Sequence, residues 1–104
     1  NLVVLVPDGE VWYNERDSYD GFCVSDNVTK ILSQVPSADA DKGCRLNIGN
    51  TAWAACATEF MDNTIAYCVD NKGNQREISN DDCKNNIING NITNCCFGAA
   101  NCIN

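Results

Sequence analysis

Eight cysteines in a chain of 104 residues constrain this sequence more than any other feature. An even number of cysteines in so short a chain is typical of an extracellular protein that is held together by disulfides. Four bridges would each contribute about 2–4 kcal/mol, which rivals the net stability of a small domain. We therefore predict that all eight are bridged, namely Cys23, Cys44, Cys56, Cys68, Cys83, Cys95, Cys96 and Cys102.

A zinc site is the alternative explanation for the cysteines. Structural zinc sites use closely spaced cysteine pairs, often together with histidine. Most successive cysteines here are separated by 11 to 20 residues, and the chain has no histidine. Disulfides are therefore favoured, with the pairing left open because eight cysteines allow about a hundred connectivities. Since the adjacent Cys95 and Cys96 cannot easily bond to each other, we expect them to join two separate parts of the molecule to one point.

The length fits one domain over residues 1–104, and the charge limits its partners. Acidic residues outnumber basic ones 14 to 7, which gives a net charge of −7. This balance argues against binding to nucleic acid and against charge-driven attack on anionic membranes. The longest apolar run, Leu2–Val6, is far shorter than the roughly 20 residues that span a bilayer, and it follows no basic segment. We expect a secreted, extracellular protein whose leader has been removed, with the oligomeric state left open.

Two segments carry the pattern of a helix that packs on a core. The first is expected to begin at Ser25 or Asp26 and to end before Pro36, because apolar residues recur at helical spacing. The second is expected to begin at Ser79, which together with Asp82 resembles a capping box, and to end at Gly90. Residues 51–61 are ambiguous, although four of them fit one helical face. The apolar positions are Val28, Ile31, Leu32 and Val35 in the first helix, and Trp53, Cys56, Ala57 and Phe60 in the ambiguous segment.

Strands are expected where alternating or β-branched residues lie between turn signals. The clearest pair is 65–69 and 75–78, joined by a turn at 70–74. Further strands are expected at 2–6, which Pro7-Asp8-Gly9 would end, and at 10–14, 45–48 and 92–97. The fold class that accommodates this order is α+β: a small disulfide-stapled sandwich with two or three helices on one face of an antiparallel sheet.

The residue types leave few routes to catalysis. Without histidine there is no Ser-His-Asp triad and no Cys-His pair, and bridged cysteines offer no thiolate. Paired carboxylates, as in glycosidases, are the remaining option, although a solvated acidic surface explains them more simply. Asp39-Ala40-Asp41 and the segment 70–73 do not match a calcium-binding loop. We predict no metal, no cofactor and no enzymatic activity. The carboxylates considered are Glu10, Glu15, Asp17 and Asp20, and separately Glu59 and Asp62.

A cluster of aromatic and acidic residues near the N-terminus is the main candidate for a binding surface. Exposed aromatic side chains are frequent anchors in protein interfaces. The alternative is that Trp12 and Phe22 belong to the core, as Trp53 most simply does. Two sequons, at Asn27 and Asn91, are candidate glycosylation sites. The predicted binding residues are Trp12, Tyr13, Glu15, Asp17, Tyr19 and Asp20, with Asn71 and Lys72 of the turn at 71–74.

Short motifs in both halves of the chain resemble a known family. Asp17-Ser18, Cys23 and the helix to Val35 are similar to the first helix of the necrosis-inducing effector domain of fungal pathogens. The second half of the chain resembles the strand, glycine turn and Asn-Asp-capped helix with isoleucines of the same domain. The matching residues are Tyr67-Cys68-Val69, Gly73, Ile78-Ser79-Asn80-Asp81, Ile87-Ile88 and Ile92. Viral and yeast killer toxins share this kind of α/β sandwich. The resemblance implies a secreted toxin or virulence effector that acts on another cell, with no catalytic residues.

Three hypotheses for function follow. The first is a killer-toxin-like or effector protein that binds a protein or cell-surface target on another cell through loops on a rigid scaffold. The second is a secreted, pheromone-like signalling ligand of a unicellular eukaryote, which predicts a mainly helical fold. The third is a small carbohydrate hydrolase that uses the carboxylates named above.

Overall fold

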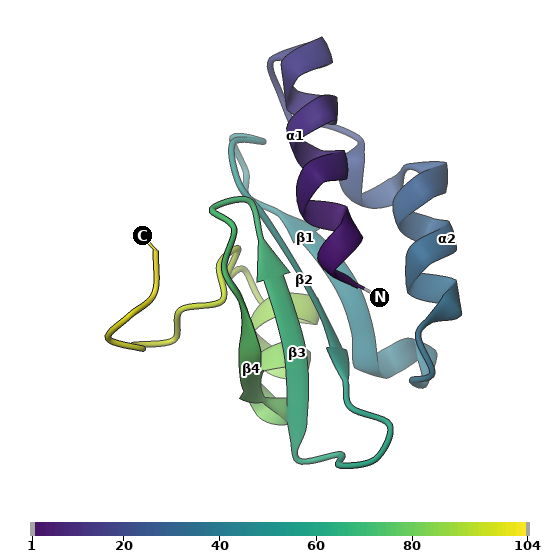
Figure 1. Ribbon diagram of the computed structural model, residues 1–104, viewed down its shortest axis with the longest axis vertical. Coiled ribbons are helices and arrows are strands. Elements are labelled where there is room, and N and C mark those ends of the chain that lie inside the picture. Colours follow the sequence, from purple (N-terminus) through teal and green to yellow (C-terminus); the bar gives the residue numbers. More distant parts are fainter. Residues whose placement is uncertain (1, 104) are drawn as a thin grey trace.

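A four-stranded antiparallel sheet forms the centre of the molecule in the computed structural model, which describes residues 2–103 (Figure 1). The strands lie side by side in chain order, and the predicted α+β class is confirmed. The predicted domain also includes Asn1 and Asn104, which lie outside the described residues. The strands are β1 (Lys42–Leu46), β2 (Trp53–Thr58), β3 (Ile65–Asp70) and β4 (Gln75–Ser79). The helices are α1 (Leu5–Arg16), α2 (Asp26–Gln34) and the π-helix η4 (Asp82–Ile88), with single 3-10 turns η1 (Leu2–Val4), η2 (Phe22–Val24) and η3 (Asp39–Asp41).

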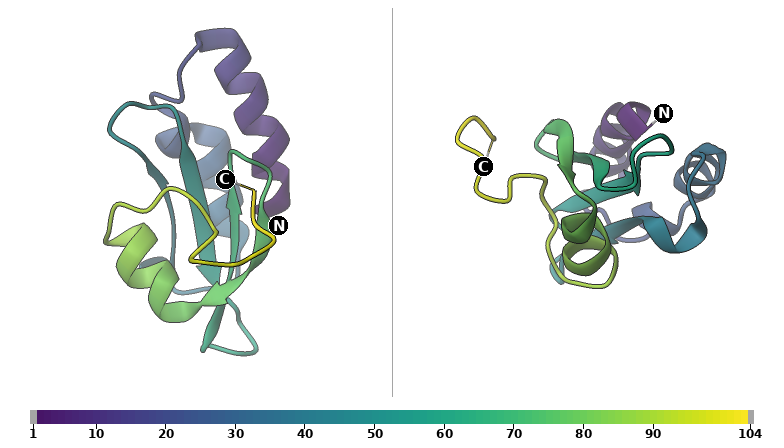
Figure 2. Two further views of the ribbon diagram at one scale, coloured as in Figure 1. Left: turned by 90° about the vertical axis from the view of Figure 1, so that its left-hand side faces the viewer. Right: turned by 90° about the horizontal axis from the view of Figure 1, so that it is seen from below.

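Helices cover both faces of the sheet, whereas the sequence predicted helices on one face. Figure 2 shows α1 and α2 on one side and η4 on the other. The physical reason lies in β2, all of whose residues are buried, because a strand with two buried faces needs cover on each. Trp53, Ala55 and Ala57 belong to the core beneath α1 and α2, and Ala54 and Cys56 belong to the core beneath η4.

The N-terminal segment is helical, so the strands predicted at 2–6 and 10–14 are wrong. Pro7-Asp8-Gly9, which was expected to end a strand, lies inside α1. A proline is tolerated there because the N–H groups of the first helical turn have no partner within the helix. The carboxylate of Asp8 is also favourable near the N-terminal end of the helix dipole. The helix ends at Asp17, whose φ is 56° and whose N–H donates to the Tyr13 carbonyl at 2.6 Å.

The elements α2, β3 and β4 lie where the sequence predicted them. Ser25 caps α2, because its Oγ accepts a hydrogen bond from the Val28 N–H at 3.3 Å. β3 and β4 pair across a turn that contains Gly73, whose φ of +91° few other residues adopt. Ser79 also begins the last helical segment as expected, since its Oγ accepts from the Asp82 N–H at 3.0 Å.

Residues 53–58 of the segment that the sequence left ambiguous form the strand β2. Two other expectations need correction. The strand expected at 45–48 is β1, which begins and ends earlier. Residues 92–97 form no strand. Their backbone is satisfied differently, since the guanidinium of Arg76 donates to the carbonyls of Cys95 and Cys96 at 3.1 and 2.8 Å. Two carbonyls of this segment therefore find a donor without a partner strand.

All eight cysteines are bridged, as predicted, and the pairs attach both helical layers to the sheet. One bridge joins η2 to β1 on the side of α1 and α2. Two bridges leave neighbouring positions of β2 and β3 for η4 and the segment after it. The adjacent Cys95 and Cys96 join two separate parts of the chain, as expected. Four disulfides in so small a fold are typical of extracellular proteins. The pairs are Cys23–Cys44, Cys56–Cys83, Cys68–Cys95 and Cys96–Cys102.

Candidate functional site

The aromatic residues predicted for binding come together, but largely as packing between α1 and the sheet. The ring centroids of Tyr13 and Tyr19 lie 4.8 Å apart. The Phe22 ring lies 6.1 Å from that of Tyr19 and 5.1 Å from that of Trp53. Phe22 and Trp53 are fully buried, which confirms their assignment to the core. Trp12 is half-buried beside Phe22, and its outer face is covered by the Arg16 guanidinium 3.6 Å from the ring centroid. These contacts leave little aromatic surface free for a partner.

Tyr19 is the most enclosed of the predicted binding residues. Only 7% of it is exposed, and its backbone N–H donates to the Asn50 carbonyl at 2.9 Å. Burial raises the pKa of its hydroxyl above the ordinary value of 10.0, and the neighbouring Tyr13 and Glu10 add to the rise. The Trp53 indole lowers the pKa by a smaller amount, although its Nε1 makes no hydrogen bond of normal geometry. Its burial places Tyr19 in the core beneath α1 rather than on a free surface.

The acidic residues of the predicted surface are exposed, but only Glu15 among them lines the groove between α1 and α2. Glu15 pairs with Arg16 at 3.1 Å, and the Asp20 carbonyl accepts from the Trp12 Nε1 at 3.1 Å. Asp17 is exposed at the end of α1. The groove has a volume of about 590 Å³ and contains Glu15 and Trp12 but neither Tyr13 nor Asp20. A binding role for these residues stays a prediction.

The turn at 71–74 lies at another place and has a clear structural role. The backbone N–H of Asn71 donates to the Trp53 carbonyl at 3.2 Å, and its side-chain Oδ1 accepts from the Trp53 N–H at 3.1 Å. Lys72 is exposed. Both residues line a small pocket of about 190 Å³ with Thr93 and Ile103, which shares no residue with the groove beside α1. The structure therefore does not bring the two predicted sets into one site.

The buried carboxylate of Asp70 organises this turn. Its oxygens accept from the backbone N–H groups of Lys72, Asn74 and Cys95 at 2.9–3.1 Å. Asn74 is also buried, and its side chain exchanges two hydrogen bonds with the backbone of Ile103. The network connects the turn to the C-terminal segment, which makes Asn71 and Lys72 part of a rigid end of the molecule.

The loop between β2 and β3, residues 59–64, exposes two large apolar side chains that are adjacent in the sequence. Phe60 is 73% exposed and Met61 is 89% exposed. Phe60 lies in the segment that the sequence left ambiguous, where it fits a helical face with Trp53, so its exposure was missed. The sequence did contain an indication of this exposure. The apolar pair lies between Glu59 and Asp62 and is followed by Asn63, and such polar residues are typical of a surface turn.

Hydrogen bonds within the loop and across its base support its conformation. The Asp62 carboxylate accepts from the Thr64 N–H at 3.0 Å and from the Thr64 hydroxyl at 2.6 Å. These two bonds lower the pKa of Asp62 below its ordinary value of 3.8, the hydroxyl having the larger effect. The Glu59 N–H donates to the Ile65 carbonyl at 3.0 Å, which closes the loop. The apolar pair therefore sits on an ordered hairpin.

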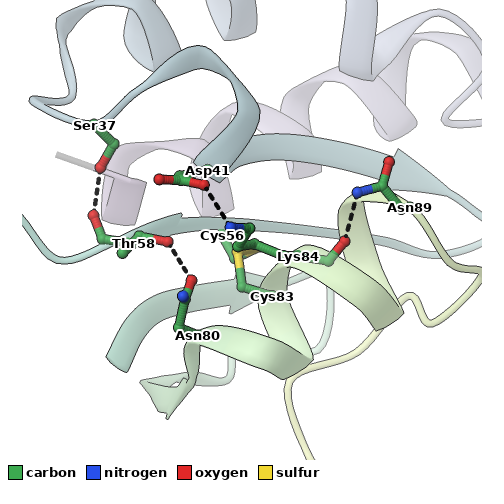
Figure 3. Close-up of polar contacts among 8 residues, drawn as sticks. All are labelled: Ser37, Asp41, Cys56, Thr58, Asn80, Cys83, Lys84 and Asn89. Atoms are coloured by element: carbon green, nitrogen blue, oxygen red, sulfur yellow. Dashed lines mark hydrogen bonds and ion pairs between the residues drawn. A yellow bond between two sulfur atoms is a disulfide. The ribbon is translucent and has the colours of Figure 1, made fainter. Parts of the chain in front are cut away.

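A second group of polar contacts fixes the base of the loop to the surrounding elements. Ser37 donates its hydroxyl hydrogen to the Thr58 carbonyl, and the Thr58 hydroxyl donates to the Asn80 Oδ1 at 2.6 Å. Lys84 of η4 pairs with Asp41 of η3 at 3.3 Å. Figure 3 shows these residues around the Cys56–Cys83 bridge, which joins β2 to η4. The loop thus rises from a base that is fixed by both covalent and polar contacts.

Two adjacent pockets lie against Phe60, and we call them, together with loop 59–64, the hairpin surface. One pocket has a volume of about 240 Å³ and the other about 370 Å³, and both have a mainly apolar lining. No lysine or arginine of the described chain lines either. The first is lined by Leu2, Gln34, Val35, Pro36, Ser37, Ala57, Thr58, Glu59, Phe60 and Tyr67. The second is lined by Pro36, Ser37, Ala38, Asp41, Thr58, Glu59, Phe60 and Asn63.

The two sequons lie in exposed positions outside the hairpin surface. Asn27 is in the first turn of α2, and its Nδ2 donates to the Asp8 Oδ2 at 2.5 Å. It lines the groove beside α1, so a glycan there would occupy that groove. Asn91 is exposed in the segment after η4. Glycosylation of both residues stays a prediction.

Comparison of the chain with models of known protein families, with curated proteins and with solved structures found no match. Over residues 2–103, no helix is long and apolar enough to cross a membrane. Within the same range, no group of three or more His, Cys, Asp or Glu side chains could hold a metal ion.

Proposed function

We propose that this chain is a secreted, non-enzymatic protein that binds a target on another cell, in the manner of a killer toxin or a virulence effector. The hairpin surface carries the proposal, because Phe60 and Met61 are largely exposed on a loop that hydrogen bonds keep ordered. Exposed apolar and aromatic side chains cost solvation energy when they face water, and they contribute most of the energy in protein interfaces when a partner covers them.

The rigidity of the scaffold supports a binding role. Four disulfides and the polar contacts at the base of the loop restrict the motion of the hairpin before any target is met. Binding by an ordered loop avoids the entropy cost of arranging flexible side chains and backbone. A rigid extracellular scaffold with one displayed loop fits a protein that recognises another molecule.

The resemblance of the short motifs to fungal necrosis-inducing effectors and killer toxins supports action on another cell. The alternative, a pheromone-like ligand, predicted a mainly helical fold. The four-stranded sheet counts against that helical ligand. The acidic surface, with a net charge of −7, also favours a specific protein target over lysis driven by charge.

The test is a dose-response of the oxidised protein on living yeasts, filamentous fungi and plant leaf tissue. Reduced and alkylated protein is the control, because it has the same sequence without the bridged scaffold. We expect growth arrest or necrosis in at least one cell type, lost on reduction. Silence over the whole panel, or equal effects of the reduced protein, would overturn the proposal.

A further inference from the structure

The pocket beside Phe60 has the size and lining of a site for one apolar side chain. Its volume is about 240 Å³, and apolar groups of Leu2, Val35, Ala57 and Tyr67 contribute to its wall. It opens next to the exposed ring of Phe60. A partner that covers Phe60 can therefore also place an apolar side chain into the pocket, which increases the contact area around one centre.

Acidic groups surround this apolar centre. Glu59 and Asp62 flank the apolar pair in the loop. Glu59 lines both pockets, and Asp41 lines the larger one. Asp41 is neutralised by Lys84 at 3.3 Å, whereas neither Glu59 nor Asp62 has a salt-bridge partner among the described residues. Lys42 also lies at this surface, because its Nζ donates to the carbonyl of the pocket residue Val35 at 3.0 Å, and the same Nζ lies 3.9 Å from the Asp39 carboxylate. Lys42 and Lys84 are thus each paired with an aspartate, and the unpaired Glu59 and Asp62 leave the rim of the surface negative.

We propose that the hairpin surface binds a basic segment of a target protein that places one apolar side chain in the pocket beside Phe60. The inference rests on the proposed function and names the chemistry of its partner. Lysine or arginine side chains of that segment meet Glu59 and Asp62, and the apolar side chain contacts Phe60 and Val35. Complementary charge at the rim increases the rate and specificity of association, and burial at the centre provides most of the affinity.

A lipid membrane is the other surface that an exposed Phe-Met pair can enter. Insertion of this loop would carry Glu59 and Asp62 toward the lipid headgroups, where anionic lipids repel them. The loop offers no lysine or arginine to compensate. The charge pattern therefore favours a basic protein over a membrane.

The experiment is an NMR titration of the folded, disulfide-bonded protein with a short synthetic peptide of alternating lysine and leucine. A glutamate–leucine peptide tests the need for basic charge, and a lysine–serine peptide tests the need for apolar side chains. We expect shifts only with the first peptide, located at residues 34–38 and 57–62, and weakened by added salt. Phe60→Ser should raise the Kd about tenfold or more, and Glu59→Gln about threefold.

Matched variants separate the surface from general effects. Ile48→Ser removes an apolar side chain that is fully exposed elsewhere, and Glu77→Gln removes an exposed acid on β4. Both should leave the Kd unchanged. No binding, shifts located elsewhere, or equal binding of either control peptide would overturn the proposal. Cosedimentation with phosphatidylcholine vesicles that depends on Phe60, without peptide binding, would assign the surface to a membrane instead.

The two proposals fail in different ways. If the protein has no effect on any cell type but binds the lysine–leucine peptide at the hairpin surface, the proposed function is overturned and the inference of a basic partner stands. A protein that acts on cells through Phe60 but ignores the peptide overturns the partner class alone.

Discussion

Gly9 sets the distance between α1 and the sheet. A Cβ at this position would lie 2.8 Å from the Nε1 of Trp53, and the whole edge of the indole lies within 3.2 Å. Trp53 cannot move aside easily because it is fully buried in the sheet. The absence of one side chain therefore allows the helix to seal the aromatic core.

We predict that Gly9→Ala destabilises the protein, because overpacking a core usually costs about 1–3 kcal/mol. Alanine offsets roughly 0.5–1 kcal/mol of this cost inside a helix, so the expected net loss is about 0.5–2 kcal/mol. Denaturant unfolding with the disulfides intact measures the difference. Gly49→Ala is the control, because its Cβ would lie 3.9 Å from the nearest atom of Thr51. A Gly9→Ala variant as stable as the control would show that the helix is free to shift.

At the scale of elements, the sequence predicted those helices and strands whose caps, turns and apolar periodicity all lie within their own residues. α2 has a cap and one apolar face, and β3 and β4 alternate around a glycine turn. α1 was missed because Gly9 interrupts its buried face where an apolar residue would have revealed the helical spacing. β2 was ambiguous because both of its faces are buried, so its residues show no alternation of polar and apolar side chains.

The loop 59–64 should respond to acid through Asp62. Hydrogen bonding lowers the pKa of Asp62 in the folded state. The stabilisation that its carboxylate provides is therefore complete above about pH 3.8 and is lost as the pH falls through the lower folded pKa. We predict that an NMR titration gives a pKa below 3.8 for the Asp62 carboxyl and that Thr64→Val raises this pKa toward 3.8. Thr51→Val, whose hydroxyl contacts Asn47 instead, should leave it unchanged. An Asp62 pKa of 3.8 or above in the unmodified protein would contradict the described loop.

At the scale of the whole molecule, the bridges could be predicted and their partners could not. The count of cysteines indicated four disulfides, but pairing depends on which strands become neighbours. Cys56 and Cys68 face the same side only because β2 and β3 pair in one register. The binding site had the same difficulty, since exposure of Phe60 depends on where β2 ends, and the packing of Tyr19 depends on α1.

Proteolysis of the unreduced protein followed by mass spectrometry tests the topology. We expect four linked pairs, Cys23–Cys44, Cys56–Cys83, Cys68–Cys95 and Cys96–Cys102. Cleavage between Cys95 and Cys96 by stepwise degradation of the linked peptides assigns the adjacent pair. A Cys95–Cys102 bridge, or any link between the first pair and the others, would contradict the fold.

The central claim is that the protein recognises another cell through the hairpin surface. The most direct test measures binding of the fluorescently labelled, disulfide-bonded protein to the responsive cells of the panel, comparing Phe60→Ser/Met61→Ser with the exposed-site control Ile48→Ser. Both variants should unfold at the same denaturant concentration as the parent, because the replaced side chains face water. We predict that the double variant loses cell binding about tenfold or more while the control binds like the parent. Equal binding of the double variant and the parent would contradict the claim.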